Sequence, residues 1–469
     1  MVCAGDRIGA AVSGGADSVA LLHLLTRVAP QFEINVAAVH INHHLRGAES
    51  DGDDQFVREL AERLGADFIR EDADVSTSSD NLEQAARDAR RAIFRSLVAD
   101  TRVDRIATGH SLSDQAETVL FRLFRGSGVT GLAGMRLVGR DGPLRPLLFF
   151  GRDEIRNWLI NNGLTWREDS SNADTRFRRN YLRHELIPQI QAELNPNLER
   201  VLAGMASRAQ AEEDYWHDLI EPLFTRFARP FKNGIIGDVL FLQNQHLAVQ
   251  RRLLRRACQV VKGNLRGLDG NHIDALLAVC ASVEGNDRLV IPGLDALRSY
   301  GKIRLLPALR PEDQKRHYRL SVQPGIDMEL PFNAGSIRLD PIQELLETQS
   351  FYANVKDETG YTETAELSVE AIGGLAGLDD LIVRNWEPGD EYRRPGHLSS
   401  HKIKALFQQE KIFLWERRHW PILEFRGEIV WARRFGAADS FSAGISGGPS
   451  LLLRYRLPCE SNNPMRTSS

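Results

Sequence analysis

Residues 13–18 read Ser-Gly-Gly-Ala-Asp-Ser, and these residue types at this spacing suit phosphate binding. Gly14 and Gly15 allow the backbone to approach a ligand closely. The loop leads into an apolar segment with helical spacing, and the N-terminus of a helix attracts anions through unpaired N–H donors and the helix dipole. Asp17 fits beside a phosphate if Mg²⁺ lies between the two. The segment therefore predicts a phosphate and Mg²⁺ site, and a Gly-Gly turn capped by Ser and Asp is the alternative interpretation.

A second group of chemical interest is the pair of carboxylates at Asp114 and Glu117. The two residues are three apart at the start of an expected helix, so they share one face. Together they could hold Mg²⁺ or accept a proton from an ammonium group. The alternative is a structural capping box at the helix N-terminus.

Arginines form two further candidate sites. Arg87 and Arg90 share a face of an expected helix, where they could bind phosphate or carboxylate or simply form i,i+4 pairs on a solvated surface. Residues 176–183 hold four arginines, interleaved with Phe and Tyr, and Arg178, Arg179 and Arg183 are among them. Phosphate contacts combined with ring stacking are typical of RNA binding. A charged helix start is the alternative.

A third basic region lies near the C-terminus. Residues 384–434 contain 11 Lys and Arg against 7 Asp and Glu, in a chain whose formal net charge is −4. Such a local excess predicts an RNA-binding surface that the overall charge does not announce. The side chains expected to be exposed there are Arg393, Arg394, Lys402, Lys404, Arg417 and Arg418.

The first 110 residues must position the N-terminal groups, and they alternate strand-like and helix-like patterns. Apolar runs at 8–12, 34–41, 67–69 and 103–108 are separated by helical spacing at 50–64 and 81–98. This alternation predicts an α/β fold with a Rossmann-like parallel sheet and helices on both faces. Ligands in such sheets bind beyond the carboxyl ends of the strands. Polar clusters at 13–18, 40–46 and 109–117 fall at those ends.

Further along the chain we expect a mostly helical middle domain and then a small α+β C-terminal domain. Helices are expected at 152–163, at 178–225 with a break at 195–197, at 245–261 and at 270–281, and residues 381–434 are strand-rich with one helix near 402–409. The domain boundaries that we predict are a catalytic domain at 1–190, a helical connection at 191–225, a substrate-recognition domain at 226–310, a connection at 311–370, an RNA-binding domain at 371–460 and a disordered tail at 461–469.

Composition narrows the class of protein. Of the 469 residues, 42% are hydrophobic and 26% are charged, which is ordinary for a protein with packed cores. No apolar run is long enough to span a membrane, and no signal peptide is recognisable. The four cysteines are far apart and form no Cys-x-x-Cys, which argues against a disulfide framework or a zinc site. The cytoplasm is the simplest compartment.

With these pieces in order, the chain resembles the tRNA(Ile)-lysidine synthetases, a family of ATP pyrophosphatases with a pyrophosphate-binding loop (PP-loop). The matching segments span nearly the whole chain in the family's order, and they are 11–18, 40–46, 81–87, 114–118, 122–128, 131–135, 169–172, 179–184, 387–390 and 417–421. One departure is Ser113, which stands where the family often has Asp.

The resemblance implies a reaction and roles for residues. ATP would adenylate the C2 oxygen of the wobble cytidine, position 34, of a tRNA(Ile) with a CAU anticodon, and free lysine would then displace AMP to give lysidine. The implied pyrophosphate-binding residues are Ser13, Gly14, Gly15, Ala16, Asp17 and Ser18, with Asp17 also on Mg²⁺. Asp114 and Glu117 would contact lysine or metal, Arg90 the activated substrate, and Arg179 and Arg183 the tRNA or reaction centre. Arg178 and the C-terminal basic side chains would bind tRNA, no membrane is involved, and a homodimer is allowed.

Three alternatives remain open at this point. A tRNA thiolase of the same ATP class would need reactive or cluster-binding cysteines, and no Cys-x-x-Cys is present. An amidotransferase would need a glutaminase half, which is not recognisable. A non-catalytic RNA-binding protein could retain a relic ATP site, although Asp17, Asp114 and Glu117 argue against it.

Overall fold

The computed structural model describes most of the chain, and it divides into two compact units, residues 1–219 and 220–469. The described residues are 2–42, 48–73, 82–139, 142–168, 178–308, 317–341, 361–443 and 449–457. The motif segments expected at 43–46 and 169–172 and the tail at 461–469 lie outside them. The two units are treated separately below.

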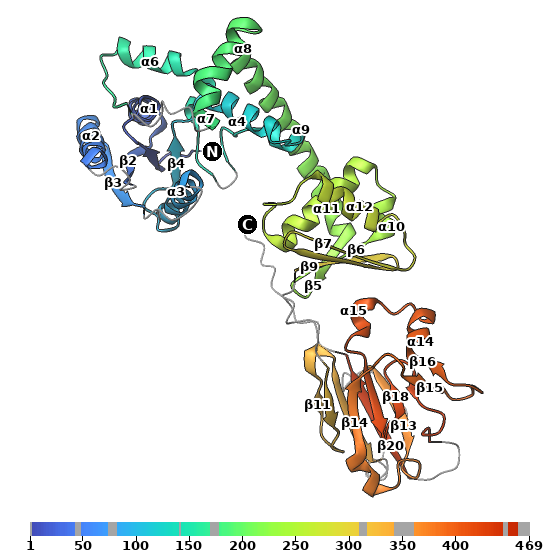
Figure 1. The fold of residues 1–469 in the computed structure, drawn as a ribbon. Coiled ribbons are helices and arrows are strands. Elements are labelled where there is room, and N and C mark those ends of the chain that lie inside the picture. The colour runs from blue at the N-terminus through green and yellow to red at the C-terminus, as the bar shows by residue number, and fades with distance from the viewer. Residues whose placement is uncertain are drawn as a thin grey trace. The chain divides into compact units, whose positions relative to one another are not determined.

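The first unit is built on a four-stranded parallel sheet with the order β3-β2-β1-β4 (Figure 1). Its strands are β1 (Arg7–Ala11), β2 (Asn35–Asn42), β3 (Asp67–Asp72) and β4 (Arg105–Thr108). Strands β1, β2 and β4 are rich in Ala, Val and Ile, as expected for strands that are buried on both faces. The edge strand β3 is mostly polar and only its Ile69 is buried. The predicted Rossmann-like parallel sheet is confirmed.

Helices cover both faces of this sheet. On one face α1 (Ala16–Phe32), α2 (Ala48–Leu64) and α6 (Arg152–Asn161) share an apolar core with β1, in which Ile8 and Leu21 are almost fully buried. On the other face α3 (Leu82–Ala99) packs Phe94 and Leu97 against side chains of β2 and β4. The sheet is therefore closed on both sides, and its carboxyl edge is where a ligand can enter.

The rest of the first unit is mostly helical, and its helices hold in place a glycine-rich loop, residues 126–135. Its helices are α4 (Leu112–Phe124), α5 (Val129–Leu132), α7 (Arg178–Tyr181), a π-helical turn (Leu182–Leu186), α8 (Ile187–Glu193) and the long α9 (Leu198–Phe227), whose last turns belong to the second unit. The Gln115 side chain exchanges two hydrogen bonds with the backbone of Met135, and Gln210 of α9 donates to the carbonyls of Ala133 and Met135. The loop is thus fixed from two helices.

The second unit begins with a helical region that also contains a sheet. Helices α10 (Val239–Gln243), α11 (Leu247–Lys262) and α12 (Gly270–Val279) accompany an antiparallel sheet of order β5-β6-β9-β8-β7. The strands are β5 (Ala228–Phe231), β6 (Gly234–Asp238), β7 (Asn286–Ile291), β8 (Leu294–Ser299) and β9 (Lys302–Pro307). Helices α11 and α12 agree with the helices predicted at 245–261 and 270–281, whereas the sheet was not predicted from the sequence.

Two antiparallel sheets form the C-terminal part. One has the order β10-β14-β17-β18-β19 and the other β11-β12-β20-β13, and both face the same large apolar core. The elements are β10 (Arg319–Ser321), β11 (Met328–Glu329), β12 (Ser336–Pro341), β13 (Glu363–Ser368), β14 (Leu381–Asn385), β17 (Pro421–Phe425), β18 (Glu428–Ala432), β19 (Gly436–Ala437) and β20 (Ser450–Arg456), with α14 (Ile403–Gln409), α15 (Leu414–Arg417) and the hairpin β15 (Glu391–Tyr392) and β16 (His401–Lys402).

The start of this C-terminal part differs from the expected boundary at 371. Strands β10 to β13 lie in the segment 311–370, which was expected to be a connection, yet β10 pairs with β14, β12 and β13 pair with β20, and β11 pairs with β12. Strands β10 and β11 have only three and two residues, so a period-2 pattern cannot be read from them in the sequence. In the described part of the chain, no helix has the length and apolar character needed to cross a membrane.

Candidate active site

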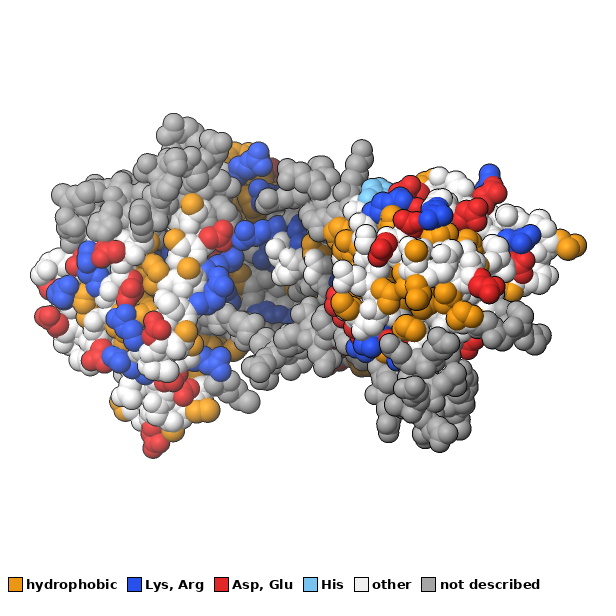
Figure 2. All heavy atoms as spheres, turned by 90° about the horizontal axis from the view of Figure 1, so that it is seen from below, with side chains coloured by type: hydrophobic (Ala, Val, Ile, Leu, Met, Phe, Trp, Pro, Cys, Tyr) orange, Lys and Arg blue, Asp and Glu red, His pale blue; other side chains and the backbone are white. Residues whose placement is uncertain are grey.

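A large cavity of about 1790 Å³ opens at the carboxyl edge of the parallel sheet. Its walls come from the loop after β1, the end of β2, α3, the start of α4, the glycine-rich loop, α6 and α7. Thirteen arginines and four acidic side chains are among the described residues that line it. Lys and Arg side chains can be seen gathered in a hollowed part of the surface (Figure 2). The cavity is therefore strongly basic although the chain as a whole is acidic, which suits a polyanionic ligand.

The floor of the cavity is the loop 13–18. Gly14 has φ +92°, a backbone conformation that would be strained in a residue with a side chain. Its carbonyl accepts a hydrogen bond from the backbone N–H of Arg167 at 2.9 Å. Gly15 is the N-cap of α1 and provides no side-chain cap, so the first N–H groups of the helix face the cavity mouth. The Ser18 hydroxyl donates to the Gly15 carbonyl at 2.9 Å and lies 3.3 Å from the Ser13 hydroxyl. This arrangement is the anion-binding end of a helix.

Gly109 allows the second polar loop to reach the first. A Cβ atom at this position would lie 2.8 Å from the carbonyl oxygen of Asp17, a distance that real Cβ atoms do not tolerate. The end of β4 can therefore lie directly against the loop 13–18 only because residue 109 has no side chain. This close approach brings the start of α4, with Asp114 and Glu117, beside Asp17.

Asp17 is the most perturbed carboxylate of the site. Burial raises its pKa to about 6, repulsion from Asp114 adds to the rise, and Arg152, Arg183 and Arg156 oppose it. Its Oδ1 atom is buried and has no hydrogen-bond partner among the described residues. An anionic oxygen that has been removed from water in this way is costly unless a cation or a proton joins it.

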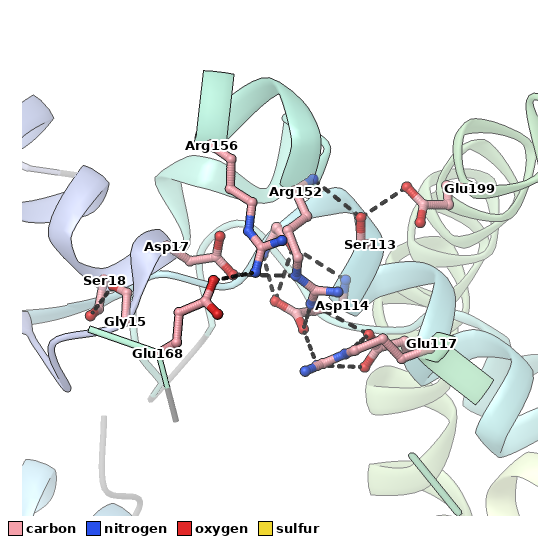
Figure 3. A network of polar contacts seen from close by, with 12 residues as sticks. Gly15, Asp17, Ser18, Ser113, Asp114, Glu117, Arg152, Arg156, Glu168 and Glu199 are labelled. Atoms are coloured by element: carbon pink, nitrogen blue, oxygen red, sulfur yellow. Dashed lines mark hydrogen bonds and ion pairs between the residues drawn. The ribbon is translucent and has the colours of Figure 1, made fainter. Parts of the chain in front are cut away.

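Asp114 and Glu117 lie together in a cluster of arginines (Figure 3). Glu117 is 1% exposed, and Arg183 binds it with Nε 2.7 Å from Oε1 and Nη2 3.1 Å from Oε2. Arg179 lies 3.6 Å from the same carboxylate and also donates to the Thr118 hydroxyl at 3.1 Å. Burial raises the pKa of Glu117, and the hydrogen bond from Arg183 is the largest opposing effect.

Asp114 has two roles in this cluster. Its Oδ2 accepts from the backbone N–H of Ser111 at 2.9 Å, which completes a capping box at the start of α4. Its Oδ1 lies 3.4 Å from Arg183, and Asp114 lines the cavity directly. A capping box is therefore present, although it joins Ser111 to Asp114 and not Asp114 to Glu117 as the spacing suggested. The two oxygens of Asp114 serve different partners, and its chemical role stays a prediction.

Arg152 is a residue of the site that the sequence reasoning missed. Its Nη2 lies 3.3 Å from Oδ1 of Asp114 and 3.4 Å from Oε1 of Glu117, and its Nε lies 3.9 Å from Oδ2 of Asp17. The arginine thus reaches all three acids (Figure 3). One signal was available: an arginine in the first turn of a helix is unfavourable for the helix dipole, so it needs another reason to be there.

The N-terminal candidates are brought together, whereas the C-terminal candidates lie in the second unit. Arg90, Arg178, Arg179 and Arg183 all line the cavity. In the second unit the exposed or half-buried candidates are Arg393, Arg394, Lys402, Lys404 and Arg418, of which Arg393 pairs with Asp439 at 2.9 Å.

Arg417 corrects the expectation that all of the C-terminal basic side chains are exposed. It is 7% exposed, and its guanidinium donates to the Ile412 carbonyl at 2.7 Å and 2.9 Å and to the Phe407 carbonyl at 3.4 Å. The reason is local: the Ile412 carbonyl lies in the turn after the end of α14 and takes its donors from Arg417 of α15. The Phe407 carbonyl accepts from the Ile412 N–H at 2.9 Å and receives Arg417 as a second donor.

Comparison with known proteins gives these features a family. Three family models match the chain: a PP-loop domain over residues 3–190, a TilS substrate binding domain over 238–304 and a TilS substrate C-terminal domain over 381–448. The tRNA(Ile)-lysidine synthase of Solibacter usitatus is 41% identical over 455 residues, which cover 97% of this chain and 99% of the relative. The chain belongs to the tRNA(Ile)-lysidine synthase family.

Other relatives in the family are more distant but equally complete. The tRNA(Ile)-lysidine synthase of Geobacter sulfurreducens is 33% identical and covers 97% of this chain and 93% of its own length. That of Clostridium tetani is 28% identical, with 99% and 97% covered. The PP-loop domain model matches residues 3–190 of this chain, and this range includes every cavity residue named above, from Ser13 to Arg183.

Proposed function

We propose that this chain uses ATP to ligate lysine to C2 of the wobble cytidine, position 34, of tRNA(Ile) with a CAU anticodon. The adenylated tRNA is the intermediate, and pyrophosphate and AMP are the two products released along with lysidine. The observation that carries the proposal is one cavity in which an anion-binding helix end, the neighbouring acids Asp17 and Asp114 and many arginines meet. Family membership supplies the identity of the ligands.

In the first step, the C2 oxygen of cytidine attacks the α-phosphate of ATP and pyrophosphate leaves. The loop 13–18 would receive the pyrophosphate moiety, because its backbone N–H groups face the cavity and Gly14 and Gly15 leave room for it. Arg152 would balance part of the charge that develops on the leaving group. Arg90 also lines the cavity and would bind the activated nucleotide.

Asp17 fits a Mg²⁺ ion. Its Oδ1 is buried without a partner, and carboxylate oxygen is a preferred ligand of this cation. Within the described ranges no cluster of three or more His, Cys, Asp or Glu could hold a metal by itself. Mg²⁺ commonly binds through one carboxylate together with substrate phosphates, and when bound it would neutralise charge on the phosphates during transfer.

In the second step, the ε-amine of lysine attacks C2 and AMP leaves. An amine is a nucleophile only after it has lost its proton, so a nearby carboxylate is required. Asp114 lines the cavity and is the better candidate to receive the ammonium group. Glu117 lies behind it, held by Arg183 and Arg179, and its role is to fix these arginines at the reaction centre.

The basic surfaces would divide the tRNA between them. Arg178, Arg179 and Arg183 line the cavity where the wobble base must leave its stack to react. The exposed basic side chains of the second unit, among them Lys402, Lys404 and Arg418, would bind the body of the tRNA through its phosphates.

The experiment that tests the proposal measures both half-reactions with purified protein. Incubation with ATP, MgCl₂ and a CAU-anticodon tRNA(Ile) transcript should release pyrophosphate, and AMP should follow only when lysine is added. A methionine tRNA transcript with the same CAU anticodon is the control for tRNA identity. Pyrophosphate release that needs no tRNA, or AMP release that needs a sulfur donor in place of lysine, would contradict the proposal.

A further inference from the structure

The Ser113 hydroxyl connects three helices beside the acidic cluster. Ser113 belongs to α4 and is 5% exposed. It accepts a hydrogen bond from the backbone N–H of Arg152 at 3.3 Å, and it donates to Oε2 of Glu199 at 2.9 Å. A hydroxyl can do both at once. Figure 3 shows the resulting chain from Glu199 on α9 through Ser113 to the backbone that carries Arg152.

The first turn of α6 needs this acceptor. Gly151 is the N-cap of α6 and has no side chain to accept from the first N–H groups of the helix. Glu154 satisfies the N–H of Gly151 at 2.7 Å, whereas the next N–H, that of Arg152, is satisfied by Ser113 from another helix. The backbone of Arg152 is thus fixed relative to α4, the helix that carries Asp114 and Glu117.

The Arg152 side chain depends on that placement. Its guanidinium lies within 3.9 Å of Asp17, Asp114 and Glu117 at the same time. A small displacement of the α6 backbone would lengthen all three contacts together, because the guanidinium is planar and its donors have a fixed geometry. Groups of a reaction centre tolerate only about 0.5 Å of such displacement.

We propose that Ser113 and Glu199 are positioning residues, which fix the first turn of α6 and thereby hold the Arg152 guanidinium between the three acids. The inference rests on the proposed function, because the rate that it affects is that of the ATP-dependent step. Ser113 and Glu199 touch no reacting atom themselves, and they act through Arg152.

The neighbouring ion pair supplies a matched control. Arg200 follows Glu199 on α9 and contacts Glu154 of α6 at 2.9 Å, so it joins the same two helices. Its side chain is 69% exposed and that of Glu154 is 49% exposed. Exposed ion pairs contribute little to stability. Arg200→Ala therefore serves as a control, because it removes a contact between α9 and α6 without touching Ser113 or Arg152.

The kinetic test compares five variants. Ser113→Ala and Glu199→Ala should lower kcat for tRNA-dependent pyrophosphate release by about tenfold, as expected for a lost buried hydrogen bond at a reaction centre, with the KM for tRNA unchanged. Ser113→Thr and Glu199→Gln keep the hydroxyl and the acceptor and should remain within about threefold of the wild type. Arg200→Ala should match the wild type. An unchanged kcat in Ser113→Ala would overturn the proposal.

A double-mutant cycle tests whether Ser113 acts through Arg152. In an Arg152→Lys background, Ser113→Ala should cost less than about twofold, because the group that it positions has already been altered. The same tenfold loss in both backgrounds would show that Ser113 acts elsewhere, and this would overturn the inference.

A readout without turnover separates this inference from the proposed function. Amide hydrogen exchange in the peptide that contains Arg152 should accelerate in Ser113→Ala, because the N–H loses its acceptor, and it should remain slow in Ser113→Thr and Arg200→Ala. If the wild type releases no pyrophosphate, the proposed function fails while exchange still tests the contact. Equal exchange in Ser113→Ala and the wild type would contradict the positioning role.

Discussion

Nε of Arg183 lies 2.7 Å from Oε1 of Glu117, a carboxylate that is 1% exposed and lies one helical turn beyond Asp114. Arg152 and Arg179 approach the same carboxylate at 3.4 Å and 3.6 Å. Three arginines therefore converge on one buried acid, and the two carboxylates that look equivalent in the sequence have different environments. Asp114 faces the cavity, and Glu117 organises the cations around it.

This difference predicts that Asp114 and Glu117 fail in different ways. Glu117→Gln should lose at least about tenfold in both half-reactions, because its arginines lose their anchor, and it should lower the free energy of unfolding by about 3 kcal/mol, as for a broken buried pair. Asp114→Asn should mainly raise the KM for lysine. Rates of pyrophosphate release without lysine and of AMP release with lysine measure the two steps. Selective loss of lysine use in Glu117→Gln would instead support the direct role expected from the sequence.

Asp17→Asn should abolish pyrophosphate and AMP release while tRNA binding stays within about twofold, since the substitution removes the charge that we propose as a Mg²⁺ ligand and leaves the basic surfaces unchanged. The fold should not suffer. Burial raises the pKa of Asp17 to about 6, so its ionised form costs stability at neutral pH, and the amide removes that cost. Turnover assays measure the loss of activity, filter binding measures the affinity for tRNA, and urea unfolding at pH 7.5 measures the stability. Near-normal AMP release by Asp17→Asn would refute the role of Asp17.

His110 predicts a pH dependence of stability. Burial lowers its pKa from 6.5 to about 4, with Arg145, Arg90 and Arg87 acting in the same direction and Asp114 opposing it. Between these two values the unfolded chain binds more protons than the folded chain, so stability is lost as pH falls from 6.5 to 4. Relative to His110→Asn, which does not titrate, the wild type should lose on the order of 3 kcal/mol over this range. Urea unfolding of both proteins at pH 7 and pH 4.5 measures it, and parallel losses would contradict the prediction.

Arg417 and Arg418 are adjacent in sequence but should respond oppositely. Arg417→Met leaves the Ile412 carbonyl without the two donors that Arg417 provides, so it should lower the free energy of unfolding by about 2 kcal/mol. Arg418→Glu leaves the fold intact, and it should raise the KM for tRNA and reduce the salt dependence of binding.

Arg426→Glu is the control for Arg418→Glu, since it makes the same charge change at an exposed arginine that is already paired with Asp380. Titrations with tRNA at two salt concentrations compare the two variants. Equal affinity in Arg418→Glu and the wild type at both salt concentrations would exclude this surface from tRNA binding.

The parallel sheet and the place of the loop 13–18 at its carboxyl edge could be predicted because their signals are local. The glycines of the loop and the buried strands act within a few residues. The capping box of α4 was placed one turn too late, since Ser111 and Asp114 form it and not Asp114 and Glu117. Arg152 was missed because it meets Asp17 and Glu117 only after α6 has packed on the sheet, and no spacing in the chain records that distance.

The C-terminal part shows the same limit. Strands β10, β12 and β13 have three to six residues, and their partners β14 and β20 lie far away in sequence, so pairing and not local pattern determines them. Arg417 looked like a surface cation beside Arg418, and only the end of α14 shows why it is buried. Charge runs therefore locate a basic region but do not say which of its members reach the solvent.

The proposed product of this cavity is lysidine. Nucleoside mass spectrometry of a CAU-anticodon tRNA(Ile) transcript, after incubation with the purified chain, ATP, MgCl₂ and isotopically labelled lysine, detects it. We predict that one cytidine per tRNA, located by fragment analysis at position 34, gains the mass of labelled lysine less one water, and that Asp17→Asn gives no labelled product. An unmodified cytidine in the presence of all substrates, or label at any other nucleotide, would contradict the proposed function.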